Sequence, residues 1–420
     1  MVRESRGPAP QPAPPVGHGS RARGDCTGRD PRPTPLTSTK ESLVKITDIR
    51  TFPLYAGGRN YLFVKVETDE GLYGMGEFGI TWKEQAGIGA IEHMRPHLLG
   101  QDPMNIEFLW QLMFRGDFFP GGRIAAAAIS AIDIALWDIK GKALDQPVHM
   151  LLGGRLRDRV VCYAGIGGRT PQDAAQAGRD RVDAGWQYLR LSVNDRDGIL
   201  DARTAVRDSV EQFAAVRDAM GPEVEICIDA HTRLDPPDAI RLGRLLEQYD
   251  PFFIEDPLRC ENPQSYRQIR QHVASPLAVG EHYATKWEFR QMVEEELLDY
   301  ARIDLCIVGG LTEARKVTNW CETHYIKIVP HNPLGPVSAA ACIQLDLATD
   351  NFAVQEGGRI GSAFLEDVFP VQVPYEAGHI LPPELPGLGI EFNEEAAGEY
   401  EFKWLNGPQL RRSDGSFTNW

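Results

Sequence analysis

Six polar residues recur at nearly equal intervals along the chain, each at the end of a short apolar run. They are Asp229, Glu255, Glu281, Asp304, His331 and Glu356, and successive members lie 23 to 27 residues apart. This interval matches one strand plus one helix, so each member is expected at the same end of a repeated strand–helix unit. One acidic residue at a strand end is more often a turn former or a helix cap, but a series in one register indicates a shared site.

The first three members of this series suit a divalent metal ion. Asp229, Glu255 and Glu281 offer only carboxylate oxygens, and no CxxC pair or HExxH motif accompanies them. Hard oxygen donors favour Mg²⁺, with the remaining coordination positions taken by water or substrate oxygens. The sequence therefore predicts Mg²⁺ held by these three carboxylates.

Two histidines are expected to flank this metal. His331 belongs to the series, and Asp304, one strand earlier, is placed to orient its ring and raise its basicity. His231 lies two residues after Asp229, which the two-residue period of a strand puts on the same face. Such a site suits removal of the proton next to a carboxylate, because the metal stabilises the enediolate that forms. The second histidine can then protonate a leaving hydroxyl, so dehydration is the predicted reaction.

Alternating strand and helix patterns position these residues. Eight strand-like runs alternate with helical patterns at residues 160–164, 188–193, 224–229, 252–255, 277–281, 300–304, 326–330 and 352–356. Such alternation implies parallel strands, and eight units in about 200 residues predict a closed (β/α)₈ barrel over residues 159–370. The carboxyl ends of barrel strands form the mouth of the active site, where the polar series would converge.

The segments outside the barrel predict an α/β protein with an N-terminal capping domain. Residues 44–158 combine a two-strand pattern, 61–68 and 72–77, with a helical pattern at 124–144, which indicates an α+β unit. Residues 371–420 lack this alternation and are expected to pack back on the capping domain and complete it. Residues 1–43 are rich in Pro, Gly and Arg, which predicts a disordered tail, with an organellar transit peptide as the alternative.

Composition excludes several classes of partner. The net charge of −15 disfavours nucleic acid and anionic membranes, which repel a negative surface. No apolar run reaches the roughly 18 residues of a membrane span. The seven cysteines are scattered and predict reduced thiols, hence a cytoplasmic protein that acts on a small molecule.

Seven segments around these residues resemble the enolase superfamily, specifically its mandelate racemase subgroup and the D-galactonate dehydratases within it. They are ISAIDIALWDIKGKALDQPV (129–148), CIDAHTR (227–233), PFFIEDP (251–257), AVGE (278–281), RIDLCIVGGLTEARK (302–316), PHNPLGP (330–336) and PGLGIEF (386–392). The resemblance runs from about Ile46 to Trp420 and leaves only the tail outside it.

The resemblance implies a role for each residue. Asp229, Glu255 and Glu281 would bind Mg²⁺, the His331–Asp304 dyad would remove the C2 proton, and His231 would expel the 3-hydroxyl group. An acid sugar such as D-galactonate would thus become a 2-keto-3-deoxy acid. The substrate contacts implied by the resemblance are Glu356, Arg190, His282 and Asn332. Homo-oligomers are usual in this family, and a lid formed by residues 55–60 and 80–82 is expected.

Departures from the family pattern leave the substrate open. Members that use a Lys-x-Lys base on the second strand would need lysines where this chain has Arg190 and Ser192, which disfavours a mandelate-type racemase. The D-galactonate dehydratases are expected to carry Lys, Arg and Cys where this chain has Arg190, His282 and Asn332. The alternatives to a dehydratase are an epimerase or cycloisomerase that uses His231 and His331 on two faces of the substrate, and a catalytically inactive barrel.

Overall fold

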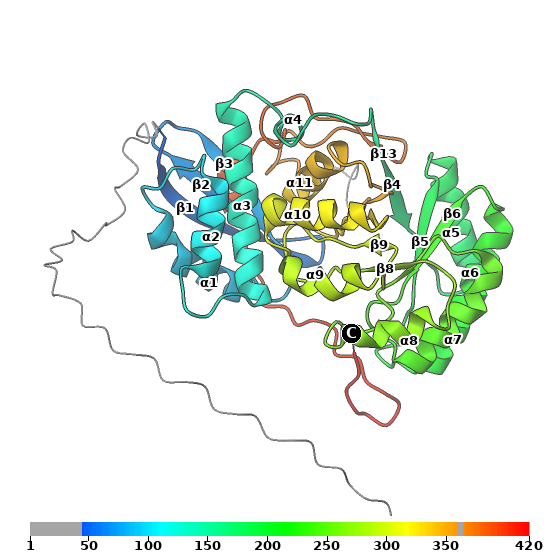
Figure 1. Ribbon diagram of the computed structural model, residues 1–420. Helices are drawn as coiled ribbons and strands as arrows, with labels where there is room; N and C mark the ends of the chain where they lie inside the picture. The colour runs from blue at the N-terminus through cyan, green and yellow to red at the C-terminus, as the bar shows by residue number, and fades with distance from the viewer. Residues whose placement is uncertain (1–43, 359–363, 420) are drawn as a thin grey trace, which may run out of the picture. The chain divides into compact units, whose positions relative to one another are not determined.

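The computed structural model describes residues 44–358 and 364–419 of the chain (Figure 1). The tail at residues 1–43, with its predicted disorder and the alternative of a transit peptide, lies outside the described residues. No helix within the described ranges is long and apolar enough to cross a membrane. The six cysteines within these ranges carry free thiols, as the sequence predicts.

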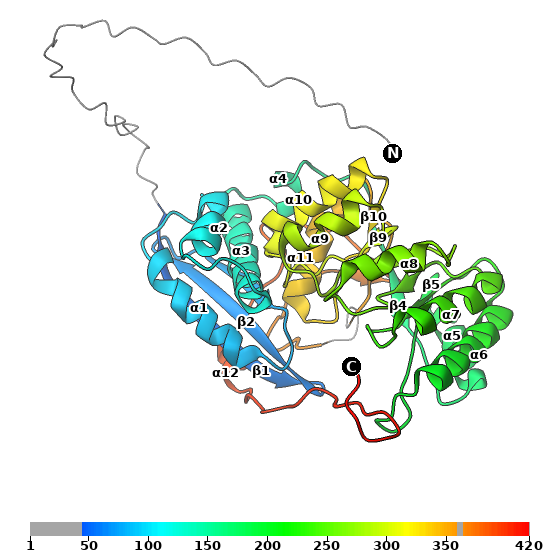
Figure 2. The same cartoon turned by 60° about the horizontal axis from the view of Figure 1, so that its bottom comes forward.

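An antiparallel meander with helices over one face forms the capping domain (Figure 2). Its strands, in the sheet order β1-β2-β3, are β1 (Ile46–Ala56), β2 (Arg59–Thr68) and β3 (Tyr73–Phe78). Its helices are α1 (Glu84–Leu98), α2 (Ile106–Arg115), α3 (Arg123–Ala143) and the short α4 (Val148–Leu151). Leu62, Val64 and Val66 alternate along β2 and pack into the core beneath the helices. The predicted strand pair is β2 and β3; β1 is an additional strand.

Eight parallel strands follow at the predicted positions. They are β4 (Val160–Gly165), β5 (Tyr188–Ser192), β6 (Glu225–Asp229), β7 (Ile254–Glu255), β8 (Leu277–Val279), β9 (Tyr300–Ala301), β10 (Lys327–Ile328) and β11 (Gln355–Glu356). The sheet runs in sequence order from β4 to β10, and β11 pairs with β4. Between β10 and β11 the described residues form one parallel bridge, Ile328 to Phe352, in place of a ladder. The (β/α)₈ fold class is confirmed, with this interrupted seam.

Helices connect the strands. They are α5 (Pro171–Asp183), α6 (Ala202–Met220), α7 (Pro236–Leu246), α8 (Tyr266–Arg270), α9 (Thr285–Glu294), α10 (Gly310–Thr323) and α11 (Pro336–Leu347), with 3₁₀ turns at Glu247–Tyr249 and Pro263–Ser265. A capping box marks the start of α5: Thr170 accepts a hydrogen bond from the Asp173 amide, and the Asp173 side chain accepts one from the Thr170 amide. All twelve residues of α11 are buried, so this helix packs in the interior.

The C-terminal segment contacts both the capping domain and the barrel. It contains β12 (Tyr375–Glu376), β13 (His379–Ile380) and α12 (Glu394–Gly398). The amide of Tyr55 in β1 donates to the carbonyl of Glu401, whereas β13 pairs antiparallel with β4. The segment thus packs on the capping domain, as expected, and also on the first barrel strand. The predicted domain boundaries stay predictions.

Helix α3 connects the capping domain to the start of α10. The Ser130 hydroxyl accepts hydrogen bonds from the Gly309 and Gly310 amides at 2.8 and 3.0 Å, and Asp133 Oδ2 accepts one from the Thr312 amide at 3.0 Å. Ser130 and Asp133 are three residues apart and therefore share one helix face. Together they satisfy amides that the first turn of α10 leaves without helical partners.

The buried Asp133 predicts a pH effect on stability. Burial raises the pKa of Asp133 to about 7 from 3.8, although hydrogen bonds from Thr312 oppose this rise. Between these values the folded protein holds a proton that the unfolded chain releases, so rising pH favours unfolding, by on the order of 1.4 kcal/mol for each pH unit. We expect the urea midpoint of the wild type to fall relative to that of Asp133→Asn between pH 4 and 7. A constant difference between the two midpoints would contradict this.

Candidate active site

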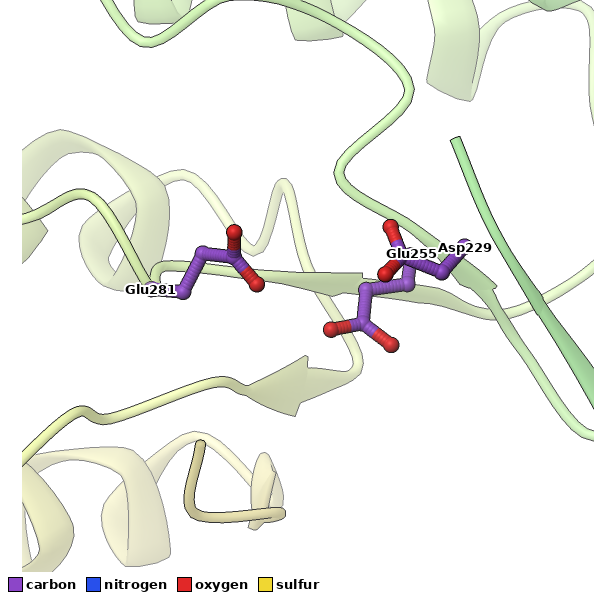
Figure 3. A group of neighbouring side chains, drawn as sticks. All are labelled: Asp229, Glu255 and Glu281. Atoms are coloured by element: carbon purple, nitrogen blue, oxygen red, sulfur yellow. The ribbon is translucent and has the colours of Figure 1, made fainter. Parts of the chain in front are cut away.

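Three carboxylates from adjacent strands converge at the carboxyl end of the barrel (Figure 3). Asp229 and Glu255 end β6 and β7 and lie opposite each other in the parallel register, and Glu281 follows β8 by two residues. Their nearest oxygens lie within 4.8 Å of one another, and none of the three residues is more than 7% exposed. Figure 3 shows the carboxylates extending toward a common space.

The charges around this space favour a divalent cation. The guanidinium groups of Arg190 and Arg302 pair with Asp229, Glu255 and Glu356, whereas Glu281 lies beside the rings of His282 and His331. Two arginines therefore face three carboxylates, and the fourth carboxylate adds to the excess of negative charge. Glu255 Oε2 and Glu281 Oε2 are buried and accept no hydrogen bond from the described residues. Buried oxygens without donors are costly, and carboxylate oxygens are the ligands that Mg²⁺ prefers. The donor set therefore fits Mg²⁺.

The carboxylates differ in proton affinity. Burial raises the pKa of Glu255 well above its ordinary value, although Arg302 opposes this rise. Burial acts in the same direction on Glu281, but His331 and His282 outweigh it and bring the pKa of Glu281 well below its ordinary value. A divalent cation between these groups would favour the ionised form of both.

His331 and Asp304 form a hydrogen-bonded pair on neighbouring strand ends. His331 Nδ1 lies 2.7 Å from Asp304 Oδ2, and His331 Nε2 lies 3.3 Å from Glu281 Oε2. Asp304 is fully buried, and its Oδ1 accepts a hydrogen bond from the Cys306 amide at 2.7 Å. Since Asp304 accepts the Nδ1 proton of the neutral ring, Nε2 is the nitrogen that can accept a proton beside the carboxylates.

His231 also lies beside the carboxylates, but not for the reason that the strand period gives. β6 ends at Asp229, and His231 and Thr232 have left-handed φ angles of 48° and 57°. The turn brings His231 Nε2 to 2.9 Å from Asp229 Oδ2, and the His231 amide donates to Asp229 Oδ1 at 2.7 Å. The expectation that His231 shares the strand face of Asp229 is therefore wrong, although the two side chains meet.

Arg302 is a central residue that the sequence analysis did not single out. It is fully buried just after β9. Its Nε donates to Glu255 Oε1 at 2.6 Å, and its Nη2 donates to Glu356 Oε2 at 2.7 Å. Its signal in the sequence is a lone arginine between Ala301 and Ile303 in an apolar strand.

Arg190, Glu356 and Asn332 lie around the same space. Arg190 Nη1 is 2.6 Å from Asp229 Oδ2 and 3.8 Å from Glu356 Oε1, so Arg190 contacts carboxylates of the site directly. The Asn332 amide donates to Glu356 Oε2 at 2.9 Å. Burial would raise the pKa of Glu356, but Arg302 and His331 lower it to about 2. Glu356 is therefore a carboxylate at neutral pH.

His282 lies at the side of the site. Its Nε2 is 3.5 Å from Glu281 Oε1, and its Nδ1 is 3.8 Å from the Cys260 sulfur. Burial lowers the pKa of His282, but contacts with Cys260 and Glu281 outweigh it and raise the pKa to about 11. His282 therefore places a positive charge beside Glu281.

A pocket of about 430 Å³ lies beside these groups. The barrel residues that line it include His231, Glu281, His282, Ile307 and His331, and the capping domain contributes Arg59, Gly79, Ile80, Thr81 and Trp82. Pockets of this size bind small molecules. The residues expected to form a lid thus supply part of its wall, while lid closure stays a prediction.

The C-terminal segment connects the expected lid to the turn that carries His231. Asn60 Nδ2 donates to the carbonyl of Lys403 at 2.6 Å, and a Cβ at Gly407 would lie 3.0 Å from the Trp82 ring. Further along, Asn419 Nδ2 donates to the Thr232 carbonyl at 3.1 Å. Figure 2 shows this red segment running from α12 toward the barrel elements.

Two family models match the chain over most of the described residues. One, enolase C-terminal domain-like, matches residues 172–396, and the other, the mandelate racemase / muconate lactonizing enzyme N-terminal domain, matches residues 55–153. The chain belongs to the mandelate racemase / muconate lactonizing enzyme family of the enolase superfamily.

The chain is also similar to individual proteins and solved structures. The chain is 37% identical to a D-galactonate dehydratase of Ralstonia nicotianae and 34% identical to a D-mannonate dehydratase of Caulobacter sp.; each match covers 90% of this chain and all of the relative. Among solved structures, it is similar to an enolase from Pantoea ananatis with bound D-gluconate and Mg, with a TM-score of 0.85 and 31% identity over 90% of this chain and all of that one.

The excess negative charge predicts that Mg²⁺ stabilises the fold. A ligand that binds only the folded state adds about 2.7 kcal/mol of stability at a hundredfold excess over its Kd. We expect millimolar Mg²⁺ to raise the Tm of the wild type and of Glu294→Gln, an exposed α9 control, but to have little effect on Glu255→Gln. An equal rise in the Tm of Glu255→Gln would exclude Glu255 as a ligand.

Proposed function

We propose that this protein is a Mg²⁺-dependent acid-sugar dehydratase, a hydro-lyase that converts an aldonate into a 2-keto-3-deoxy acid. The observation that carries the proposal is the convergence of a buried carboxylate triad with two histidines, His231 and His331, that line one pocket. The dehydratases among the relatives and the D-gluconate and Mg of the Pantoea ananatis structure support it.

The proposed Mg²⁺ ligands are Asp229, Glu255 and Glu281. Bound Mg²⁺ supplies positive charge for the substrate carboxylate, which makes the neighbouring C2 proton more acidic. His282 and Asn332 are proposed to contact the substrate, and Glu356 to lie beside its carboxylate. For Arg190, the contact with Asp229 supports a role in holding that side chain, and its predicted contact with substrate stays a prediction.

The proposed proton transfers use the two histidines. His331 accepts the C2 proton at Nε2, and Asp304 fixes its tautomer and stabilises the charge that the ring gains. His231 gives a proton to the 3-hydroxyl group, the C3–O bond breaks, and water leaves. The enol product then tautomerises to the 2-keto-3-deoxy acid. We further propose a cytoplasmic homo-oligomer; free cysteines of the described chain are consistent with a reducing compartment.

A substrate panel tests the function. Purified protein with Mg²⁺ is incubated with aldonic and aldaric acids, and keto acids are detected with semicarbazide. We expect turnover of D-galactonate or one of its stereoisomers, and none by Glu255→Gln. Silence across the panel, with Mg²⁺ shown to bind, would favour an epimerase or cycloisomerase, and would direct the search to racemised or cyclised products.

Substitutions of the two histidines should affect dehydration and C2 proton exchange differently. His331→Asn is expected to abolish both turnover and exchange of the C2 proton with D₂O, whereas His231→Asn is expected to stop dehydration and leave some exchange. General acid–base catalysis by one side chain raises a reaction rate by about 10²–10⁴-fold, so we expect each substitution to lower kcat by a factor in this range. Proton NMR of the substrate in D₂O measures both processes. Undiminished exchange in His331→Asn would remove His331 as the base, and undiminished dehydration in His231→Asn would remove His231 as the acid.

A further inference from the structure

Glu77 in β3 reaches from the capping domain to the start of α11. It is fully buried. Its Oε1 accepts a hydrogen bond from the Gly335 amide at 2.8 Å, and its Oε2 accepts one from the Ser338 amide at 2.9 Å. Gly335 is the N-cap residue of α11 and Ser338 lies in its first turn, where backbone N–H groups lack helical partners and negative charge is favoured. One side chain thus holds the beginning of a barrel helix.

The segment held by Glu77 carries His331. Gly335 follows His331 by four residues, and Arg59 Nη1 in β2 donates to the carbonyl of Pro333 between them at 2.9 Å. A Cβ at Gly335 would lie 2.9 Å from Glu77 Oε1 and 3.0 Å from the Phe63 ring, so glycine permits this close approach. Capping-domain side chains therefore fix the path of the chain from His331 into α11.

The same strand end contacts the loop that carries Asp304. The Gly79 amide donates to the Cys306 carbonyl at 3.1 Å, and the Cys306 amide donates to Asp304 Oδ1 at 2.7 Å. A Cβ at Gly79 would lie 2.6 Å from the Ile307 side chain. Glu77 and Gly79, two residues apart, thus each contact one of the two loops that carry the dyad.

We propose that Glu77 is a positioning residue for the His331–Asp304 dyad. By anchoring the start of α11 it holds His331 at the distance at which Asp304 accepts the Nδ1 proton. Since Ile80, Thr81 and Trp82 of the pocket wall follow β3 after Gly79, Glu77 also ties the position of the proton acceptor to the expected lid. The proposal rests on the proposed function, in which His331 removes the C2 proton.

The kinetic consequence follows from the geometry. Proton transfer requires the acceptor within hydrogen-bond reach, and a displacement of about 1 Å can cost a hundredfold in rate. The dyad does not provide all of the binding contacts, so moving it should lower kcat more than it raises KM.

The test compares Glu77→Gln with Asp133→Asn in the full-length protein. Asp133 holds the start of α10 from the capping domain as Glu77 holds α11, but it has no contact with His331 or Asp304. In Glu77→Gln an NH₂ group replaces one acceptor oxygen, so one amide of α11 loses its partner. We expect Glu77→Gln to lower kcat and C2 exchange together, by about tenfold to a hundredfold, with KM changed less than about threefold. Asp133→Asn should keep kcat within about twofold, whatever its effect on Tm.

A second variant covers the case in which Glu77→Gln does not fold. Gly335→Ala leaves Glu77 intact and inserts a methyl group at the point of contact, so it should displace the same segment and lower kcat in the same way. Unchanged kcat in the folded variants, with a lowered Tm only, would make Glu77 a purely structural anchor and overturn the proposal.

An NMR measurement separates this proposal from the proposed function. In protein labelled with ¹⁵N-histidine, a strong bond from His331 Nδ1–H to Asp304 should give a downfield proton resonance that His331→Asn lacks. We expect Glu77→Gln or Gly335→Ala to shift or lose this resonance and Asp133→Asn to retain it. If the wild type dehydrates no acid sugar, the proposed function fails while this measurement still decides whether Glu77 positions the ring; an unmoved resonance overturns the proposal.

Discussion

The crowding of negative charge at the carboxyl end of the barrel is the constraint on which the rest of the structure depends. Removing several carboxylates from water costs several kcal/mol each unless cations compensate. Arg302 bonds two of them with one planar group, a geometry that lysine does not offer. The remaining excess favours a divalent ion. The carboxylates that would destabilise a purely structural core thus form a site in which a bound divalent cation can stabilise the carboxylate of a substrate.

The capping domain is joined to the barrel by a second use of buried carboxylates. Asp133 and Glu77 each lie at the start of a barrel helix, α10 and α11, and accept hydrogen bonds from amides that have no acceptor within the helix. An apolar interface alone would tolerate small shifts, because dispersion contacts are non-directional. Hydrogen bonds to defined amides fix the register between the domains, which matters where the two domains line one pocket.

The sequence predicted the strands and the polar series because both follow local periods, and Asp229, Glu255 and Glu281 meet for that reason. Arg302 was missed because its partners lie 47 and 54 residues away and become neighbours only when the barrel forms. The strand-face placement of His231 failed because a left-handed turn, which no two-residue period foresees, follows β6. The contacts of the C-terminal segment are irregular, so no repeat could locate its path beside the pocket.

The contacts that complete the pocket also set the order in which the chain can fold. Asn60 bonds a residue 343 positions away, and Arg59 one 274 positions away. Closing such long loops costs entropy before any contact is gained, whereas neighbouring strand–helix units close short loops. We therefore expect the barrel units to gain structure early and the walls of the pocket to form late. A partly folded population would carry native-like secondary structure without a binding site, so activity is the last property that the folding chain acquires.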